Sequence, residues 1–433
     1  MAAYETTEIS PKYHKAISDW QERNFPELGT LEKNWSKYFG KQTPFRLISK
    51  IGKLKSPTIS VGRYQGRPYF EAADEMGGNM FFSAQGIVKA QCSTELGSVQ
   101  QHRMSIDGAI TDEMKYGILR IMAEELRHAY QMFWVLEHDP TWRRMGMGDV
   151  AGQMIQELLS METGQHVLDA FNMEMQSFLD NVMFATLIDL VGKYQLDMQS
   201  VFAYGPMARS MGPMLVEEGF HLGHGRKCVR QIAIMAADGK GDFSVKDIQL
   251  HLNKWLARGL EMFGNELGGG TNIEFGFKDK TNIQAQDLYY AEATDFVRDW
   301  NCAMVTKVYR KGTEYVDANE IVERIWETKD DVKGIKPDMI IHTPARNFFR
   351  KRGLEEYVFQ PNDVHGTLLT RVGGVPIGCD EFVEYLHGVL PEGFFEDPEW
   401  HKFVDELYKH HGEPKPGANG SNGSDGTNGN GQA

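Results

Sequence analysis

The sequence lacks the cysteine patterns that support disulfide frameworks, thiolate zinc sites and iron–sulfur clusters. Its four cysteines, Cys92, Cys228, Cys302 and Cys379, are scattered over 433 residues, and no two of them form a Cys-x-x-Cys pair. Such sites need closely spaced or paired cysteines. We therefore expect any electrons that the protein uses to come from a separate partner.

Long apolar runs and basic blocks are missing as well. No apolar run approaches the roughly 18 residues of a membrane-spanning helix, and the polar first 15 residues lack the apolar core of a signal peptide. Acidic residues outnumber basic ones by 60 to 46, which gives a net charge of −14, and no Lys/Arg block is present to neutralise phosphates. These absences predict a cytoplasmic protein that binds neither nucleic acid nor a membrane.

Motifs for nucleotide cofactors are also absent. The glycines at 268–270 follow no strand-like segment, and residues 223–227 lack the spacing of a phosphate-binding loop and lie within a helical pattern. The sequence therefore predicts no bound flavin or nicotinamide. If the chemistry is redox, it requires an external NAD(P)H-dependent reductase that carries a flavin or an iron–sulfur cluster.

What the sequence does contain is a duplicated Glu-Glu-x-x-His motif. Glu125 and His128 recur as Glu218 and His221, and both members are displaced by 93 residues (125 to 218 and 128 to 221). Residues three apart lie on the same face of an α-helix, so each pair could hold a metal ion. The constant displacement is the register expected of two helix pairs related by internal duplication.

Each motif is preceded by one more carboxylate on an apolar helical face. Glu95 lies 30 residues before Glu125, and Asp189 lies 29 residues before Glu218. A single Glu-x-x-His is more often a surface pair than a metal site. Buried carboxylates without a counter-charge would cost several kcal/mol each, which favours a shared cation. Six ligands on four helices are typical of a ferritin-like di-iron bundle, and the predicted metal ligands are Glu95, Glu125, His128, Asp189, Glu218 and His221.

The roles of several neighbouring residues stay open at this point. Glu124 and Glu217 lie about 100° round the helix from the ligands, which favours a solvent-facing or outer position. His224 is a possible seventh ligand, although packing or an outer role is favoured. Arg127 is equally consistent with an outer hydrogen bond or with the surface, and Tyr130 with an outer hydrogen bond or with the core.

The chain is expected to be mostly α-helical and to divide into four parts. These are an N-terminal wrapping segment with a short hairpin at 58–70 (residues 1–84), a ferritin-like helical core (85–310), a small α+β C-terminal extension whose role is not legible (311–411) and a disordered tail (412–433). The tail is rich in Gly, Asn and Ser and cannot bury enough apolar surface to become ordered.

Three helix boundaries in the core can be stated in advance. Thr111, followed by two acidic residues, is expected to cap a helix over 111–136. Residues 152–181 carry a long helical pattern that either continues to 195 or gives way to a new helix at 180. Pro213 is expected near the start of the helix that bears Glu218, where its missing N–H is tolerated.

The segments that carry the predicted ligands resemble the benzoyl-CoA epoxidase oxygenase component and its phenylacetyl-CoA epoxygenase relatives, a family of ferritin-like di-iron oxygenases. The likeness covers residues 85–235, and an aspartate in place of a glutamate in the second half is a comparatively specific part of it. The matching stretches are residues 93–95, 99–103, the two Glu-Glu-x-x-His motifs, Asp189 with 192–196, and 206–209.

The resemblance implies an O2-dependent monooxygenase or epoxidase of an aromatic CoA thioester in aromatic catabolism. Two iron ions would be the cofactor and O2 the co-substrate, with one oxygen atom going to the ring and the other to water. Glu125 and Glu218 would bridge the irons and act as the catalytic ligands. His128 and His221 would each complete one iron, and Glu95 and Asp189 would bind terminally.

Two other functions remain open from the sequence. A di-iron oxygenase of the same fold could act on a different substrate, for example by N-oxygenation of an arylamine. A metal protein that is not an oxygenase, such as a ferroxidase or a manganese catalase, is the alternative from another class.

Overall fold

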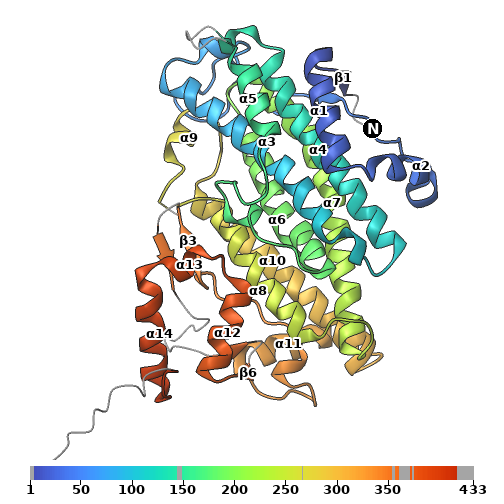
Figure 1. Ribbon diagram of the computed structural model, residues 1–433, viewed down its shortest axis with the longest axis vertical. Helices are drawn as coiled ribbons and strands as arrows, with labels where there is room; N and C mark the ends of the chain where they lie inside the picture. Colours follow the sequence, from blue (N-terminus) through green and yellow to red (C-terminus); the bar gives the residue numbers. More distant parts are fainter. Residues whose placement is uncertain are drawn as a thin grey trace, which may run out of the picture.

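The computed structural model shows a chain built almost entirely of helices around one central bundle (Figure 1). It describes residues 4–143, 149–265, 267–353, 356–359, 371–372 and 375–416. In the bundle α3 packs on α4 and α6 on α7, while α4 and α3 pack across on α7 and α6. This confirms the mostly-α, ferritin-like fold. The bundle helices are α3 (Asn79–Ser105), α4 (Asp112–Glu137), α6 (Phe178–Gln199) and α7 (Gly205–Ala237).

The start of α4 agrees with the sequence, whereas the pattern after it was misread. The Thr111 side chain accepts a hydrogen bond from the Met114 backbone N–H at 3.2 Å, as expected of an N-cap. Residues 152–181 do not form one helix. The helix α5 (Val150–Leu159) ends early, Gly164 adopts a left-handed φ of 91°, and Ser177 caps a new helix, α6. The long irregular connection therefore lies between the two halves of the bundle.

Pro213 lies inside α7 and not near its start, where Pro206 is found instead. A proline cannot donate to the carbonyl four residues before it, which here belongs to Arg209. That carbonyl accepts the backbone N–H of Gly52 at 2.9 Å. A side chain at Gly52 would collide with Pro213. The proline is tolerated because the N-terminal segment supplies the missing donor.

The predicted hairpin at 58–70 is wrong, and the N-terminal strand pairing lies elsewhere. Ile59 exchanges two backbone hydrogen bonds with the turn that follows, but no strand forms there. The Phe70 backbone instead bonds to residues 203 and 205, at the start of α7. An antiparallel pair joins β1 (Glu5–Thr7) to β2 (Ser49–Ile51).

Further helices enclose the bundle and lead to a C-terminal extension. The helices α1 and α2 lie against α3 and α4, and α8 and α10 lie against α6 and α7. The extension has its own apolar cluster, which includes Phe349, Phe382 and Phe403. The remaining elements are α1 (Pro11–Asn24), α2 (Leu28–Phe39), α8 (Val245–Glu261), α9 (Gly270–Glu274), α10 (Asn282–Met304), α11 (Tyr315–Thr328), α12 (Cys379–Val389), α13 (Gly393–Glu396) and α14 (Pro398–His411), the hairpins of β3 (Arg350–Arg352) with β4 (Glu356–Val358) and β5 (Arg371–Val372) with β6 (Val375–Pro376), the π turn η5 (Val305–Tyr309), and the short 3-10 turns η1 (Ala73–Glu75), η2 (Ile106–Gly108), η3 (Pro140–Arg143), η4 (Asp169–Phe171) and η6 (Pro337–Met339).

The chain end and the question of a membrane span complete the description. Gly412 ends α14 in a left-handed conformation, and the Glu413 carboxylate accepts the Cys379 backbone N–H at 3.0 Å. The rest of the predicted tail, residues 417–433, lies outside the described residues. In the described part of the chain, no helix is both long enough and apolar enough to cross a membrane.

Candidate metal centre

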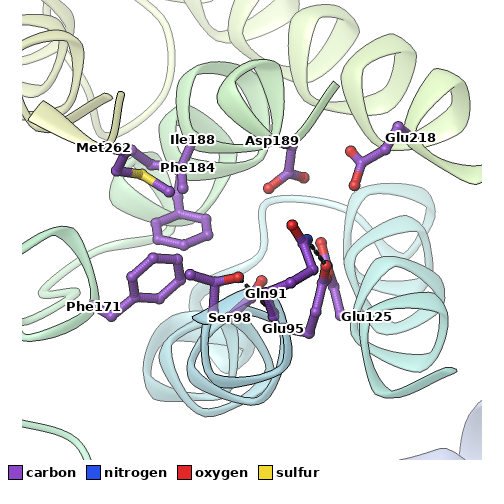
Figure 2. Close-up of a pocket in the computed structure, with 12 residues that line it drawn as sticks. Gln91, Glu95, Ser98, Glu125, Phe171, Phe184, Ile188, Asp189, Glu218 and Met262 are labelled. Carbon is purple, nitrogen blue, oxygen red and sulfur yellow. Dashed lines mark hydrogen bonds between the residues drawn. The ribbon is translucent and has the colours of Figure 1, made fainter. Parts of the chain in front are cut away.

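The structure brings all six predicted ligands together inside the bundle. The helices α3 and α6 contribute one residue each, and α4 and α7 contribute two each. Every one of the six side chains is at most 4 % exposed. Figure 2 shows the carboxylates of Glu95, Glu125, Asp189 and Glu218 pointing toward one another across a small space. The duplicated spacing thus becomes one buried cluster.

The His128 ring nitrogen Nδ1 faces three carboxylates. It lies 3.3 Å from Glu95 Oε2, 3.6 Å from Glu125 Oε2 and 3.8 Å from Glu218 Oε1. These oxygens come from three different helices. One cation placed among them would have one nitrogen and three oxygen ligands.

The His221 ring repeats the same arrangement in the second half. Its Nδ1 lies 3.4 Å from Glu125 Oε1, 3.4 Å from Glu218 Oε2 and 3.8 Å from Asp189 Oδ2. Glu125 and Glu218 therefore each offer one oxygen to either histidine, whereas Glu95 and Asp189 approach one histidine each. This is the geometry of two bridging and two terminal carboxylates around a pair of ions.

The hydrogen bonds left unmade inside the cluster fit a metal pair. Nδ1 of both histidines, Oδ2 of Asp189 and Oε2 of Glu218 are buried without a hydrogen-bond partner. Each histidine Nε2 contacts a carboxylate behind it, so a proton on Nε2 leaves the Nδ1 lone pair available to a cation. Buried polar atoms without partners are costly, and coordination would satisfy all four. The residues present fit two metal ions.

The electrostatics of the cluster point the same way. Burial, with the negative charge of Glu125 nearby, raises the pKa of Glu95 and of Asp189 well above the usual value. Burial also opposes ionisation of Glu125, but hydrogen bonds from Glu95 and both histidines outweigh it and hold the pKa of Glu125 low. Protons balance the crowded carboxylates in the metal-free protein. Divalent cations would take their place.

Two further carboxylates hold the histidines from behind. Glu217 on α7 accepts a hydrogen bond from His128 Nε2 at 2.9 Å, and Glu124 on α4 accepts one from His221 Nε2 at 3.1 Å. Both are buried, so the outer position that the sequence left open is correct and the solvent-facing one is not. Each helix thus carries a ligand histidine and the carboxylate that orients the histidine opposite. The doubled glutamate of the motif was the signal for this exchange.

Basic side chains neutralise the outer carboxylates. Arg127, buried to 1 % exposure, donates from Nε to Glu217 Oε2 at 2.7 Å, and Lys50 donates to the other oxygen at 2.5 Å. Burial opposes ionisation of Glu217, but the charge of Arg127 holds its pKa well below the ordinary range. Arg120 pairs with Glu124 at 3.0 Å. Lys50 comes from β2, and the sequence pattern contained no signal for it.

The other two open residues serve packing. His224 Nε2 lies 3.2 Å from the Met114 carbonyl oxygen in the first turn of α4, and burial lowers its pKa to about 4. The Tyr130 hydroxyl accepts the Ile9 backbone N–H at 3.0 Å and ties the N-terminal segment to the bundle. Neither makes a contact with the six-residue cluster that the structure records.

Two cavities lie beside the cluster. The first, of about 30 Å³, touches all four cluster carboxylates and is otherwise walled by apolar side chains such as Phe171, Phe184 and Ile188 (Figure 2). The second, of about 160 Å³, shares Gln91, Thr94, Gly192 and Met262 with the first. A small molecule in the second cavity would therefore lie next to the cluster.

One comparison with known proteins bears on this site. The chain is 28% identical over 176 residues to benzoyl-CoA oxygenase component B of Aromatoleum evansii. The chain is thus similar to an oxygenase component. The match covers 40% of this chain and 36% of the relative, so the chain spans little more than a third of that protein's length. No family model matches the chain. The likeness is distant, and it supports a relationship to this group of oxygenases without identifying a substrate.

Proposed function

We propose that this protein is the oxygenase component of a di-iron, O2-dependent monooxygenase or epoxidase that acts on an aromatic substrate. The observation that carries the proposal is the pair of histidine Nδ1 atoms, each facing three carboxylate oxygens, with Glu125 and Glu218 common to both. Mixed imidazole and carboxylate ligands suit iron. The distant likeness to an oxygenase component supports the same chemistry.

When bound, two iron ions would supply reductive activation of O2. The chain's own residues would hold that pair and control its surroundings. Glu125 and Glu218 bridge, because each presents one oxygen to either histidine, and Glu95 and Asp189 bind terminally. Glu217 and Glu124 retain the proton on each histidine Nε2, which keeps Nδ1 directed at the metal.

The side of the cluster toward α3 and α6 is where a substrate would bind. Phe171, Phe184 and Ile188 exclude water there. Gln91 holds Glu95 by donating to its Oε1 at 2.5 Å. A cavity of about 150 Å³ is known to hold benzene, so the neighbouring 160 Å³ space has room for one aromatic ring.

The finer assignment is epoxidation of an aryl-CoA thioester in aromatic degradation. The resemblance of the ligand segments and the printed name of the distant relative support it. The test is mass spectrometry of the products formed under 18O2 from a panel of aryl-CoA thioesters. One 18O atom per product, located in the ring, is expected. Consumption of O2 with no labelled product would contradict an oxygenase.

Electrons should come from a separate reductase. Protein reduced chemically and then exposed to O2 should oxygenate at most one substrate equivalent per di-iron site, and oxidised protein should oxygenate none. Sustained turnover of the purified protein with NAD(P)H and no partner would contradict this. Peroxide disproportionation, or iron oxidation without product, would favour the catalase or ferroxidase alternatives.

A further inference from the structure

The second cavity contains a charged side chain that the metal centre does not use. It extends from the cluster along the space between α3 and α6, and Lys278, from the loop before α10, contributes to its wall. The Lys278 ammonium donates to the Gln195 side-chain oxygen at 2.6 Å. This cation therefore lies at the same cavity as the proposed catalytic site.

The helix α6 measures the distance from the cluster to that lysine. Asp189, Gly192 and Gln195 follow one another at steps of three and line the same side of α6. At 1.5 Å per residue, Gln195 lies about 9 Å along the axis from Asp189. That separation accommodates one aromatic ring and a short polar group between the lysine and the cluster.

The charge of Lys278 has no counter-ion among the described residues, because no carboxylate in that part of the chain lies within ion-pair distance of it. Its neighbour Lys280, by contrast, pairs with Asp279 at 2.9 Å and with Asp197 at 3.5 Å. Burial lowers the pKa of Lys278 to about 8, so the ammonium form still predominates at neutral pH. A largely buried ammonium that bonds only to a neutral amide is costly, and an anionic ligand would offset that cost.

The rest of the cavity suits the body of such a ligand. Ile87, Leu168, Val191 and Met262 provide apolar walls. Apolar surface with a few well-placed polar groups is the usual character of a small-molecule site. An anion with one ring matches both the volume and the placement of the charge.

We propose that Lys278 binds the carboxylate of the substrate, so that the protein oxygenates a small aromatic acid whose ring lies between Lys278 and the metal ligands. The inference rests on the proposed oxygenase function and narrows its substrate class. It distinguishes a free acid, which carries the charge that Lys278 lacks, from a thioester, whose carbonyl group is neutral.

The test is calorimetric binding of sodium benzoate to the full chain, with and without iron. The decisive variant is Lys278→Met, and the matched control is Lys280→Gln, which removes the same charge two residues away from a cation that already has partners. Benzamide serves as the neutral isostere of benzoate. Benzoyl-CoA serves as the thioester.

Benzoate affinity should fall about tenfold or more in Lys278→Met and should be unchanged in Lys280→Gln, because a hydrogen bond to a charged group is lost only in the first. Benzamide should bind weakly and equally to both. Ala90→Phe, a change at an exposed position on the cavity wall, should also weaken benzoate binding while the iron content stays constant.

The inference is overturned if the unaltered chain does not bind millimolar benzoate, if Lys278→Met binds it as tightly as the unaltered chain, or if benzoyl-CoA displaces benzoate and binds the variant equally well. None of these outcomes affects the oxygenase proposal, which depends on O2 uptake by the reduced, iron-loaded protein. Conversely, absence of O2 uptake would refute the oxygenase and leave the benzoate measurement intact.

Discussion

The two halves of the candidate centre have the same plan but different surroundings. In the first half Glu95 is fixed by Gln91, whereas in the second half the shorter Asp189 leaves Oδ2 without a hydrogen bond. Gly192 also belongs to the second half, and a Cβ there would come within 3.2 Å of Glu218 Oε1. The first half is thus more tightly held. The second has the room that a carboxylate needs if its coordination is to change.

A second difference lies behind the histidines. Glu217, which supports His128, is neutralised by Arg127 and Lys50, and Arg127 is almost completely buried. Glu124, which supports His221, is paired with Arg120 alone. The duplication therefore conserves the ligands while the supporting charges differ. Substitutions at matched positions measure how much that asymmetry matters.

The largest effect is expected where the halves are joined. Glu125→Ala and Glu218→Ala should each reduce iron from about two ions per chain to nearly none, because both carboxylates serve both ions. Elemental analysis after anaerobic reconstitution measures this. Glu113→Ala, at an exposed position on α4, is the control and should retain two. Retention of both ions by either bridging variant would refute the bridging assignment.

The next comparison separates the two ions. His128→Ala and His221→Ala should each retain about one iron per chain, since each ring faces its own position in the cluster. Metal content and the loss of magnetic coupling between the irons report the result. Loss of both ions from one variant alone would show that one position must be filled before the other.

The outer carboxylates test the asymmetry directly. Glu217→Gln and Glu124→Gln should each weaken metal binding by about 10-fold to 100-fold. Glu217→Gln should in addition lower the free energy of unfolding by about 3–5 kcal/mol, because it leaves the Arg127 charge buried and unpaired. Denaturant titration of both metal-free variants provides the comparison. Equal stability losses would contradict the unequal roles assigned to Arg127 and Arg120.

The smallest effect is expected from exchanging the terminal carboxylates. Glu95→Asp should weaken iron binding by about tenfold, since the shortened side chain also loses its hydrogen bond from Gln91. Asp189→Glu should weaken it less, because the adjoining cavity can accept the extra methylene. Competition with a coloured chelator measures both affinities. A larger loss in Asp189→Glu would reverse the assignment of the open half.

Sequence reasoning succeeded where local spacing determines geometry. The i, i+3 spacing of Glu125 with His128 and the Thr111 cap depend on one helix at a time, and the structure places both as expected. It failed where tertiary contacts decide. Pro213 is accommodated inside α7 only because Gly52, some 160 residues earlier, bonds to the freed carbonyl.

The surroundings of the site were less predictable for the same reason. Arg127 and Lys50 meet Glu217 from separate elements, and no local pattern announces that they converge. Lys278 has an ordinary loop sequence and becomes notable only once α6 is placed beside it. The ligand set is thus readable from periodicity, whereas the groups that tune it depend on how the helices pack.

The most direct test of the account is anomalous X-ray diffraction at the iron edge from crystals of the iron-loaded protein. We predict two peaks about 3.5–4 Å apart, one beside His128 Nδ1 and one beside His221 Nδ1, with the carboxylates of Glu125 and Glu218 between them. A single peak, or iron bound away from these six side chains, would contradict a di-iron centre.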